Sequence, residues 1–369
     1  MNSSKVKYVA LDVHARHTVM GMMQEDGVYL GSERFDTNEP ELLKRLKQLP
    51  SACLLTLEEG PMAVWIKFLA DRYVEKVLIC NPKENYAISR NAKKQDKEDV
   101  RILCRLARLG ELKEVRHPEQ MHRIEFREAV SHYHDMTRGQ VVEKQKIKAH
   151  YREHGVVVHD SKEVYQQAHW ARFIEQLPHR TARMQAMMFY EILTCKLRQQ
   201  ERAYQQVVEL SRKYPEIEEF QKIPGVGPIV AATVDAIVFC PERFADKRRL
   251  HQYCQLGITD KSSDGKSLGF KRLNRNGNPL LKYMSYAAWR ASLHVGKNQP
   301  PNEVCCFYRR VLKETNKRAA ARLTTQRKIL TTMWAIWKNQ TPYDPRCFAE
   351  PHFVVINRNQ PPDNLSKER

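Results

Sequence analysis

The segment KKQDKEDVRILCRL at residues 93–106 predicts the start of an amphipathic helix around which the first domain is organised. Its apolar residues recur at three-residue steps and mark one buried face, formed by Val100, Leu103, Leu106 and Leu109. Asp96 and Asp99 stand three residues apart in the first turn, so both carboxylates can point at one spot, as a hard cation requires. Alternatively, two acids in a first turn complement the helix dipole and face water. Acids upstream in the chain decide between these interpretations.

The composition of the 369 residues points to two or three domains that bind a polyanion. There are 62 Lys and Arg against 43 Asp and Glu, a formal net charge of +19. Such a surplus is typical of proteins that bind a phosphate backbone. A basic protein can instead bind acidic lipid, but no apolar run approaches the length of a membrane span, and the first segment is polar. We therefore expect neither a transmembrane helix nor a signal peptide.

The nine cysteines include no C-x-x-C pair, and several stand inside apolar runs. They predict reduced core thiols in a cytosolic protein, and neither zinc ligands nor disulfides.

The order of elements in the first 80 residues predicts an RNase H-like α/β domain. Alternating apolar residues predict an antiparallel meander of three strands, which is followed by a helix, a strand, a second helix and a fifth strand. The expected strands cover residues 6–14, 17–23, 28–35, 52–57 and 77–80, and the expected helices cover 38–49 and 62–73.

Two further acids fall where this fold gathers functional groups. Asp12 stands on the first strand and Glu58 at the carboxyl end of the fourth, and Asp96 and Asp99 on the following helix can reach the same edge. Clustered carboxylates repel one another unless cations occupy the site, so the four acids predict two divalent metals, most simply Mg²⁺, acting on a phosphodiester. Asp12 can alternatively be a satisfied structural acid. Only one of Glu58 and Glu59 should face the site, because adjacent strand residues point to opposite faces, and we choose Glu58.

Residues 117–214 read as helical and strongly charged. One seam follows alternating four- and three-residue steps, which suits an antiparallel hairpin or an intermolecular coiled coil, and a surface helix packed on its own domain is the alternative. The seam consists of Ala186, Tyr190, Leu193, Leu197, Gln200, Tyr204 and Val207. Residues 150–160 contain Gly155 and no sustained period, so they predict a loop.

A second informative segment is IPGVGPIVAAT at residues 223–233. A Gly-Val-Gly turn that leads into a helix is typical of a helix-hairpin-helix, in which backbone amides near Gly225 and Gly227 contact a DNA phosphate. The alternative is a tight turn between two helices.

Residues 257–278 predict a polar, Gly-rich loop with two adjacent serines, Ser262 and Ser263. Hydroxyls beside cations suit a serine that attacks a phosphodiester, and the cations here are Lys266, Lys271, Arg272 and Arg275. Taken alone, Ser-Ser-Asp-Gly is also a commonplace flexible loop. A core helix is expected at 279–293, a basic helical stretch for backbone contact at 309–328, and a disordered tail from about residue 357.

Three ordered blocks resemble the DEDD transposases of insertion sequences, a family that includes Piv-like DNA invertases and bridge-RNA-guided recombinases. The resemblance runs from Tyr8 to about Trp337. The first block comprises Asp12, Leu-Glu-Glu-Gly-Pro at 57–61 and Lys-Gln-Asp-Lys-Glu-Asp at 94–99. The second is Ile-Pro-Gly-Val-Gly-Pro at 223–228, with Arg-Phe at 243–244 after its helix, and the third runs from Gly257 through the serines to Asn-Gly-Asn at 276–278.

The resemblance implies four parts in the chain. A RuvC-like domain at 1–116 holds metal on Asp12, Glu58, Asp96 and Asp99, and a helical, coiled-coil region covers 117–214. A serine-containing transposase domain with the helix-hairpin-helix covers 215–345, and a flexible tail covers 346–369. The family usually has serine directly before glycine, whereas Asp264 intervenes here, so Ser263 and then Ser262 are the expected nucleophiles, with Ser267 as an outsider.

The implied function is that of a transposase or site-specific recombinase that forms a covalent phosphoserine link to DNA, with Mg²⁺ or Mn²⁺ as cofactor. The implied partners are donor and target DNA, a noncoding guide RNA from the same element, and further copies of the chain in a dimer or tetramer. The implied location is the bacterial cytoplasm, in association with the nucleoid. Two alternatives remain, a metal-dependent RuvC-like junction-resolving nuclease and a noncatalytic nucleic-acid-binding protein.

Overall fold

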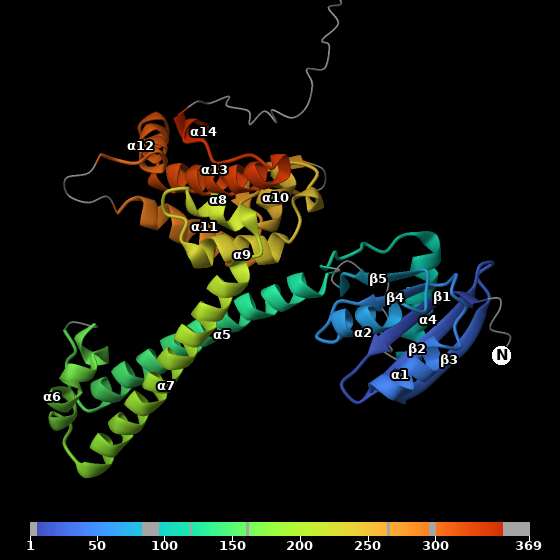
Figure 1. Ribbon diagram of the computed structural model, residues 1–369, viewed down its shortest axis with the longest axis horizontal. Helices are drawn as coiled ribbons and strands as arrows, with labels where there is room; N and C mark the ends of the chain where they lie inside the picture. Colours follow the sequence, from blue (N-terminus) through green and yellow to red (C-terminus); the bar gives the residue numbers. More distant parts are fainter. Residues whose placement is uncertain are drawn as a thin grey trace, which may run out of the picture. The chain divides into compact units, whose positions relative to one another are not determined.

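The computed structural model describes residues 6–82, 96–118, 120–159, 162–263, 266–294 and 300–349, with the side chains of 260–271 left out. The chain forms two compact units, Met1–His117 and Pro118–Arg369 (Figure 1). The expected tail beyond residue 357 lies outside the described residues.

The first unit is built on a five-stranded sheet in the order β3-β2-β1-β4-β5. Neighbours β3, β2 and β1 run antiparallel, whereas β1, β4 and β5 run parallel. The strands are β1 (Val6–Val13), β2 (His17–Gln24), β3 (Tyr29–Asp36), β4 (Leu54–Glu58) and β5 (Lys76–Cys80), and the helices are α1 (Glu39–Leu46), α2 (Ala63–Ala70) and α4 (Asp96–Leu109). The expected meander followed by alternating strands and helices is confirmed, and it is consistent with an RNase H-like domain.

Helices cover both faces of this sheet, as the alternation of its strands requires. Val9 and Leu11 of β1 share an apolar cluster with residues of α1 and α2. Ala10, one residue out of step, belongs to a second cluster with Val100 and Cys104 of α4. Tyr8 and Ala10 of β1 therefore face α4.

The buried face of α4 differs in part from the expected one. Val100 and Leu103 are buried as predicted, but Cys104 and Ala107 complete the face, and Leu109 is 48% exposed. A helix advances 3.6 residues per turn, so a stripe in strict three-residue steps rotates away from the core within three turns.

In the second unit, α5 (Met121–Glu153) and α7 (Arg180–Ser211) form a long antiparallel hairpin (Figure 1). The Tyr151 and Tyr190 hydroxyls lie 3.1 Å apart near the tip, and the Gln140 amide donates to Gln200 further along the hairpin. The tip carries η3 (Glu163–Tyr165), η4 (Gln167–His169) and α6 (Trp170–Glu175). An intermolecular coiled coil stays a prediction. The expected loop at 150–160 was too long, because α5 extends to Glu153.

The rest of the second unit is mainly helical, with one β-hairpin. Its elements are α8 (Pro215–Gln221), α9 (Pro228–Val238), η5 (Pro241–Arg243), α10 (Lys247–Tyr253), β6 (Ile258–Ser263), β7 (Lys266–Leu273), α11 (Pro279–Ser292), α12 (Glu303–Thr315), α13 (Arg318–Asn339) and α14 (Arg346–Ala349). One apolar cluster joins α8, α9, α11 and α13 to the root of the α5–α7 hairpin, through side chains such as Phe126 and Val207.

The expected loop at 257–278 was wrong in its central part, which forms the antiparallel strands β6 and β7. The polar composition concealed the strands because a hairpin with little apolar surface lacks the alternation on which strand prediction relies.

Among the described residues, no helix is long and apolar enough to cross a membrane. All nine cysteines are free thiols, as expected, but Cys195 and Cys306 are exposed, so the prediction of core thiols was wrong for these two.

Candidate metal centre

Asp12 and Glu58 lie side by side at the carboxyl ends of two parallel strands. Leu11 of β1 pairs in register with Leu57 of β4, so the next position along each strand brings Asp12 beside Glu58. Both share the face of Ala10 and Thr56, which is the face that α4 covers. Glu59 follows the strand, and its Oε1 lies 3.9 Å from Nε2 of His117. This geometry supports the choice of Glu58 over Glu59.

The first turn of α4 begins at the same edge of the sheet. Asp96 is its first residue and Asp99 follows one turn later, and both are partly buried. Oδ1 of Asp99 is inaccessible to solvent, so this acid does not simply face water at the helix start. The described structure thus brings the two acids of α4 to the sheet face that carries Asp12 and Glu58.

Two histidines that sequence reasoning missed join these acids. Nε2 of His14 lies 3.2 Å from Oδ2 of Asp12 and 3.9 Å from Oδ1 of Asp96. Nε2 of His17 lies 3.3 Å from Oδ2 of Asp96, and the two imidazole rings are 4.9 Å apart. The available signal was the spacing Asp-x-His-x-x-His at 12–17, in which the end of one strand, the turn after it and the start of the next strand carry metal-ligand side chains.

Thr37 holds the β1–β2 turn that carries His14. Its Oγ1 donates to the carbonyl of His14 at 2.8 Å, and its backbone N–H donates to the carbonyl of Arg16 at 3.0 Å. The Thr37 hydroxyl also lies 2.8 Å from that of Thr18, and the N–H of His14 donates to His17 across the turn. Four hydrogen bonds therefore limit the movement of both histidines' backbones.

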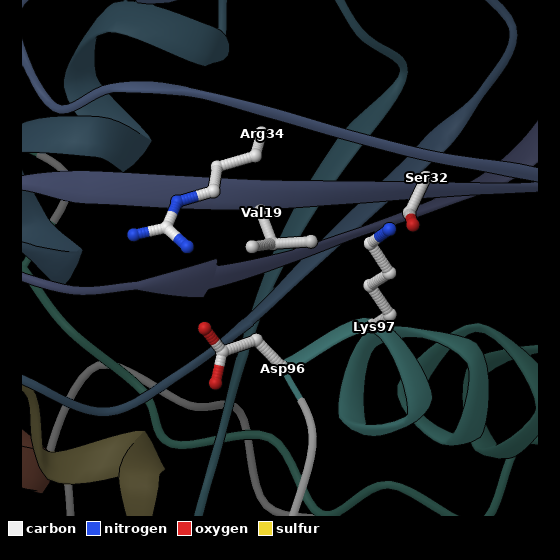
Figure 2. A pocket seen from close by; sticks show the side chains of 5 residues that line it. All are labelled: Val19, Ser32, Arg34, Asp96 and Lys97. Carbon is white, nitrogen blue, oxygen red and sulfur yellow. The ribbon is translucent and has the colours of Figure 1, made fainter.

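A hollow of about 370 Å³ opens beside Asp96 on the same face of the sheet (Figure 2). Its lining residues are Val19, Ser32, Arg34, Asp96 and Lys97. In Figure 2, the Arg34 guanidinium and the Asp96 carboxylate lie on one side of Val19, and the Lys97 ammonium and the Ser32 hydroxyl lie on the other. Within the described parts of the chain, neither cation forms an ion pair. The hollow thus places two positive charges next to the acids.

The residues at this edge fit a divalent cation. Donor atoms of His14, His17 and Asp96 lie within 4.8 Å of one another, and the Asp12 carboxylate approaches the same imidazole. Carboxylate oxygens suit Mg²⁺ and Mn²⁺, and imidazole nitrogens suit first-row transition ions. All of these side chains keep some solvent access, so water or a substrate oxygen can complete the coordination.

The two glycines of the candidate helix-hairpin-helix have different surroundings. Gly225 has φ +89°, and a Cβ built on it would lie 2.2 Å from the carbonyl oxygen of Ala288 in α11. Gly225 therefore permits close packing on α11. Gly227 is the N-cap of α9 and has no atoms near the position of a Cβ. Its open surroundings leave room for an approaching phosphate, so of the two glycines Gly227 is better placed for the predicted backbone contact.

The candidate serines stand at the end of the β6–β7 hairpin. Ser263 pairs with Lys266 in the backbone register and Ser262 pairs with Ser267, while the side chains of Lys266, Lys271 and both serines lie outside the described ones. The arginines among the predicted cations, Arg272 and Arg275, are exposed.

Hydrogen bonds from backbone and side-chain amide groups hold the base of this hairpin. The N–H of Asn274 donates to the carbonyl of Gly257, and its side-chain amide donates to the carbonyl of Gln252 in α10. Asn278 caps α11 by accepting from Leu280 and Leu281. Asn274 and Asn278 therefore fix where the serine-bearing strands leave the helical core.

The basic stretch at 309–328 divides into two groups of side chains. Arg310 donates to the carbonyls of Phe348 and Ala349, and Arg327 donates to the carbonyl of Leu256, so these two stabilise the fold. Arg322, which lies over the Tyr286 ring, and Lys328 are half-buried, and exposed cations remain at Arg309, Lys313, Lys317 and Arg318. Backbone contact with nucleic acid is therefore expected from the second group alone.

Two family models match the chain. Residues 9–155 match a model of DEDD transposases of the IS110 type, described as a transposase, and span the sheet with all four candidate carboxylates. Residues 217–301 match a model described as a transposase of the IS116/IS110/IS902 family, and span the Gly-Val-Gly turn and the β6–β7 hairpin. No curated protein matches the chain.

Proposed function

The chain belongs to the DEDD transposase family of insertion sequences, and we propose that this transposase cuts and rejoins DNA through a covalent phosphoserine intermediate. Asp12, Glu58, Asp96 and Asp99 would hold divalent ions, Mg²⁺ or Mn²⁺, and Ser263 or Ser262 would be the nucleophile. The observation that carries the proposal is the convergence of acids from β1, β4 and α4 on one edge of the sheet.

A bound divalent ion would neutralise charge on the phosphate and on the leaving oxygen. The serine Oγ forms a bond to phosphorus as one P–O bond of the DNA breaks, and the hydroxyl proton ends on the released DNA oxygen. A DNA hydroxyl then attacks the phosphoserine and restores both the serine and a phosphodiester. The number of phosphate ester bonds is constant throughout, so the reaction needs no ATP, and the sequence contains no P-loop.

Cations near the carboxylates and near the serines would bind the phosphate and stabilise the negative charge of the reaction. Arg34 and Lys97 line the hollow beside Asp96, and neither forms an ion pair with another described residue. Their two positive charges would attract a phosphate of the bound DNA strand. On the other unit, Lys266, Lys271, Arg272 and Arg275 flank the serines in sequence and would stabilise the charge that develops on phosphorus. Backbone amides at Gly227, with Gly225 shaping the turn, would contact a further phosphate.

The proposed partners are donor and target DNA, a guide RNA encoded by the same element, and further copies of the chain. The net charge of +19 supports contact with a polyanion. The exposed cations of α12 and α13 support binding to the phosphate backbone of the guide RNA. A protein holds a guide RNA through its backbone and shape, because the bases of the RNA are used to pair with the DNA.

A covalent-trapping experiment tests the proposal. Full-length protein, RNA from the flanking region of the element, Mg²⁺ and labelled junction DNA are incubated, denatured in detergent and separated by size. We expect label to migrate with the wild-type protein, and to be lost in Asp12→Ala and in one of Ser262→Ala and Ser263→Ala. Ser211→Ala on α7 is a matched control, because this serine donates only to the carbonyl of Val207 in its own helix.

The alternatives give different results. A junction-resolving nuclease would release cut DNA without an adduct and would be insensitive to either serine change. A noncatalytic binding protein would cut nothing with Mg²⁺ and would bind DNA equally well after Asp12→Ala. Either result would overturn the phosphoserine mechanism.

A further inference from the structure

His14 and His17 lie beside the candidate carboxylates, at positions from which their imidazole nitrogens can bind a metal ion. A centre built from the four carboxylates alone gives these two histidines no role. Two donors in adjacent positions on one first-row ion are about 3–3.5 Å apart, since each bond is about 2.0–2.2 Å long. The pairs His14–Asp12 and His17–Asp96 are separated by 3.2 and 3.3 Å, and His14–Asp96 by 3.9 Å. The first two distances, which are also those of hydrogen bonds, fall in the range expected for neighbouring ligands, and the third is longer.

The donors come from elements held at fixed register. Asp12 is the last residue but one of β1, His14 is in a turn fixed by Thr37, and His17 begins β2 on the face that α4 covers. Asp96 is the first residue of α4, 79 positions away from His17 in the chain. Three ligand atoms, from His14, His17 and Asp96, therefore lie within 4.8 Å of one another, and Oδ2 of Asp12 lies 3.2 Å from Nε2 of His14.

Hydrogen bonding to the acids is the simpler explanation for the histidines, but it leaves one feature unexplained. Nε2 of His14 can donate its one proton to Asp12 at 3.2 Å, which leaves the Asp96 carboxylate 3.9 Å away without a hydrogen bond from this ring. A cation among these atoms accepts the lone pairs of both imidazoles and neutralises both carboxylates.

We propose that His14, His17 and Asp96 ligate one ion of the centre, with Asp12 beside His14 at its edge, so that this is a mixed nitrogen and oxygen site. Mg²⁺ takes oxygen ligands, whereas imidazole favours first-row transition ions, so this position would select an ion of the Mn²⁺ class over Mg²⁺. The inference rests on the proposed metal centre and adds its ligands and its metal preference.

The test uses Mn²⁺ as the probe with the full-length protein. Electron spin-echo envelope modulation detects imidazole nitrogen bound to Mn²⁺, so the wild-type spectrum alone is informative and does not depend on the folding of a variant. We expect strong nitrogen modulation, reduced in His14→Ala and in His17→Ala and absent in the double variant. Mn²⁺ affinity, measured from the signal of the free ion, should fall by roughly tenfold or more in each variant. Mg²⁺ affinity should change by less than about threefold, because oxygen ligands remain.

The control is His132→Ala, since this histidine is exposed on α5 in the other unit and should leave both signals unchanged. Wild-type Mn²⁺ without nitrogen modulation, or modulation that persists in the double variant, would overturn the inference. If Asp12→Asn abolishes Mn²⁺ binding while no nitrogen coupling is seen, the centre has oxygen ligands only, and the proposed function survives without this inference. If nitrogen coupling is seen but the protein forms no covalent adduct with DNA, the phosphoserine mechanism is refuted and the mixed metal site is supported.

Discussion

Gly225→Ala tests whether the Gly-Val-Gly turn is first of all a packing feature of the second unit. The new methyl group would lie 2.2 Å from the carbonyl oxygen of Ala288 and 2.7 Å from the amide nitrogen of Ser292. Both are backbone atoms of α11, which cannot move aside as the end of a flexible side chain does. The turn and α11 must therefore separate, or the backbone at 225 must change its conformation.

The magnitude follows from two costs. Placing a non-glycine residue at φ +89° costs about 1–2 kcal/mol, and overpacking a well-packed contact costs about 1–3 kcal/mol. We expect the free energy of unfolding of this unit to fall by about 2–5 kcal/mol, a large fraction of the total for a typical domain. With a typical urea dependence, this lowers the midpoint by about 1 M.

Equilibrium unfolding in urea, followed by tryptophan fluorescence, measures this change. Four of the five tryptophans, at positions 170, 289, 334 and 337, belong to the second unit, so the signal reports mainly on it. The matched control is Gly227→Ala, which has φ −84° and open space, and should cost no more than about 1 kcal/mol through the weaker N-cap. A Gly225→Ala protein with wild-type stability would refute the packing argument. Loss of DNA affinity in Gly227→Ala at unchanged stability would support a phosphate contact.

Three further predictions concern the turn, the hollow and pH. Thr37→Val removes the hydroxyl that holds the β1–β2 turn, so the stability of the first unit should fall by about 1–2 kcal/mol in thermal unfolding, and Mn²⁺ should bind more weakly. Arg34→Gln with Lys97→Gln should reduce the salt dependence of DNA binding, the slope of log K against log salt, by about 1–2, as measured by fluorescence anisotropy. Burial, and then the charge of Arg327, lower the pKa of His251 to about 4. Since the unfolded imidazole protonates near pH 6.5, the unfolded chain binds the proton first, and stability should fall by about 2–3 kcal/mol between pH 6.5 and pH 4, as measured by urea unfolding.

Each of these predictions has a matched comparison. A Thr37→Ser protein keeps a hydroxyl and should recover most of the lost stability, and a Thr37→Val protein with wild-type stability would contradict the role given to that hydroxyl. Lys44→Gln with Lys47→Gln removes the same charge from exposed positions on α1 and at its C-cap, on the opposite face of the sheet. An equal change in the salt-dependence slope for this pair would show a general charge effect. His251→Gln should flatten the pH dependence, and a slope equal to wild type would exclude this residue as its source.

Local patterns predicted the element order of the first unit well, because the spacing of apolar residues that distinguishes strands from helices is visible within a few neighbouring positions. The alternation in residues 6–24 and the acidic first turn before Val100 were sufficient to place β1, β2 and α4. The same reasoning failed where few apolar residues carry the period. Strands β6 and β7 were expected to be a loop, and Leu109 was expected to be buried.

The sequence by itself determined which chemistry the chain carries, since its acids, its serines beside cations and its surplus of positive charge are independent of packing. Tertiary structure alone decided which of these groups meet. The register between β1 and β4 brings Glu58 beside Asp12, and the packing of α4 brings Asp96 to His17, 79 residues away. It also decided that Gly225 serves a close approach to α11. Pairings of this kind depend on contacts between residues far apart in the chain, which no local period specifies.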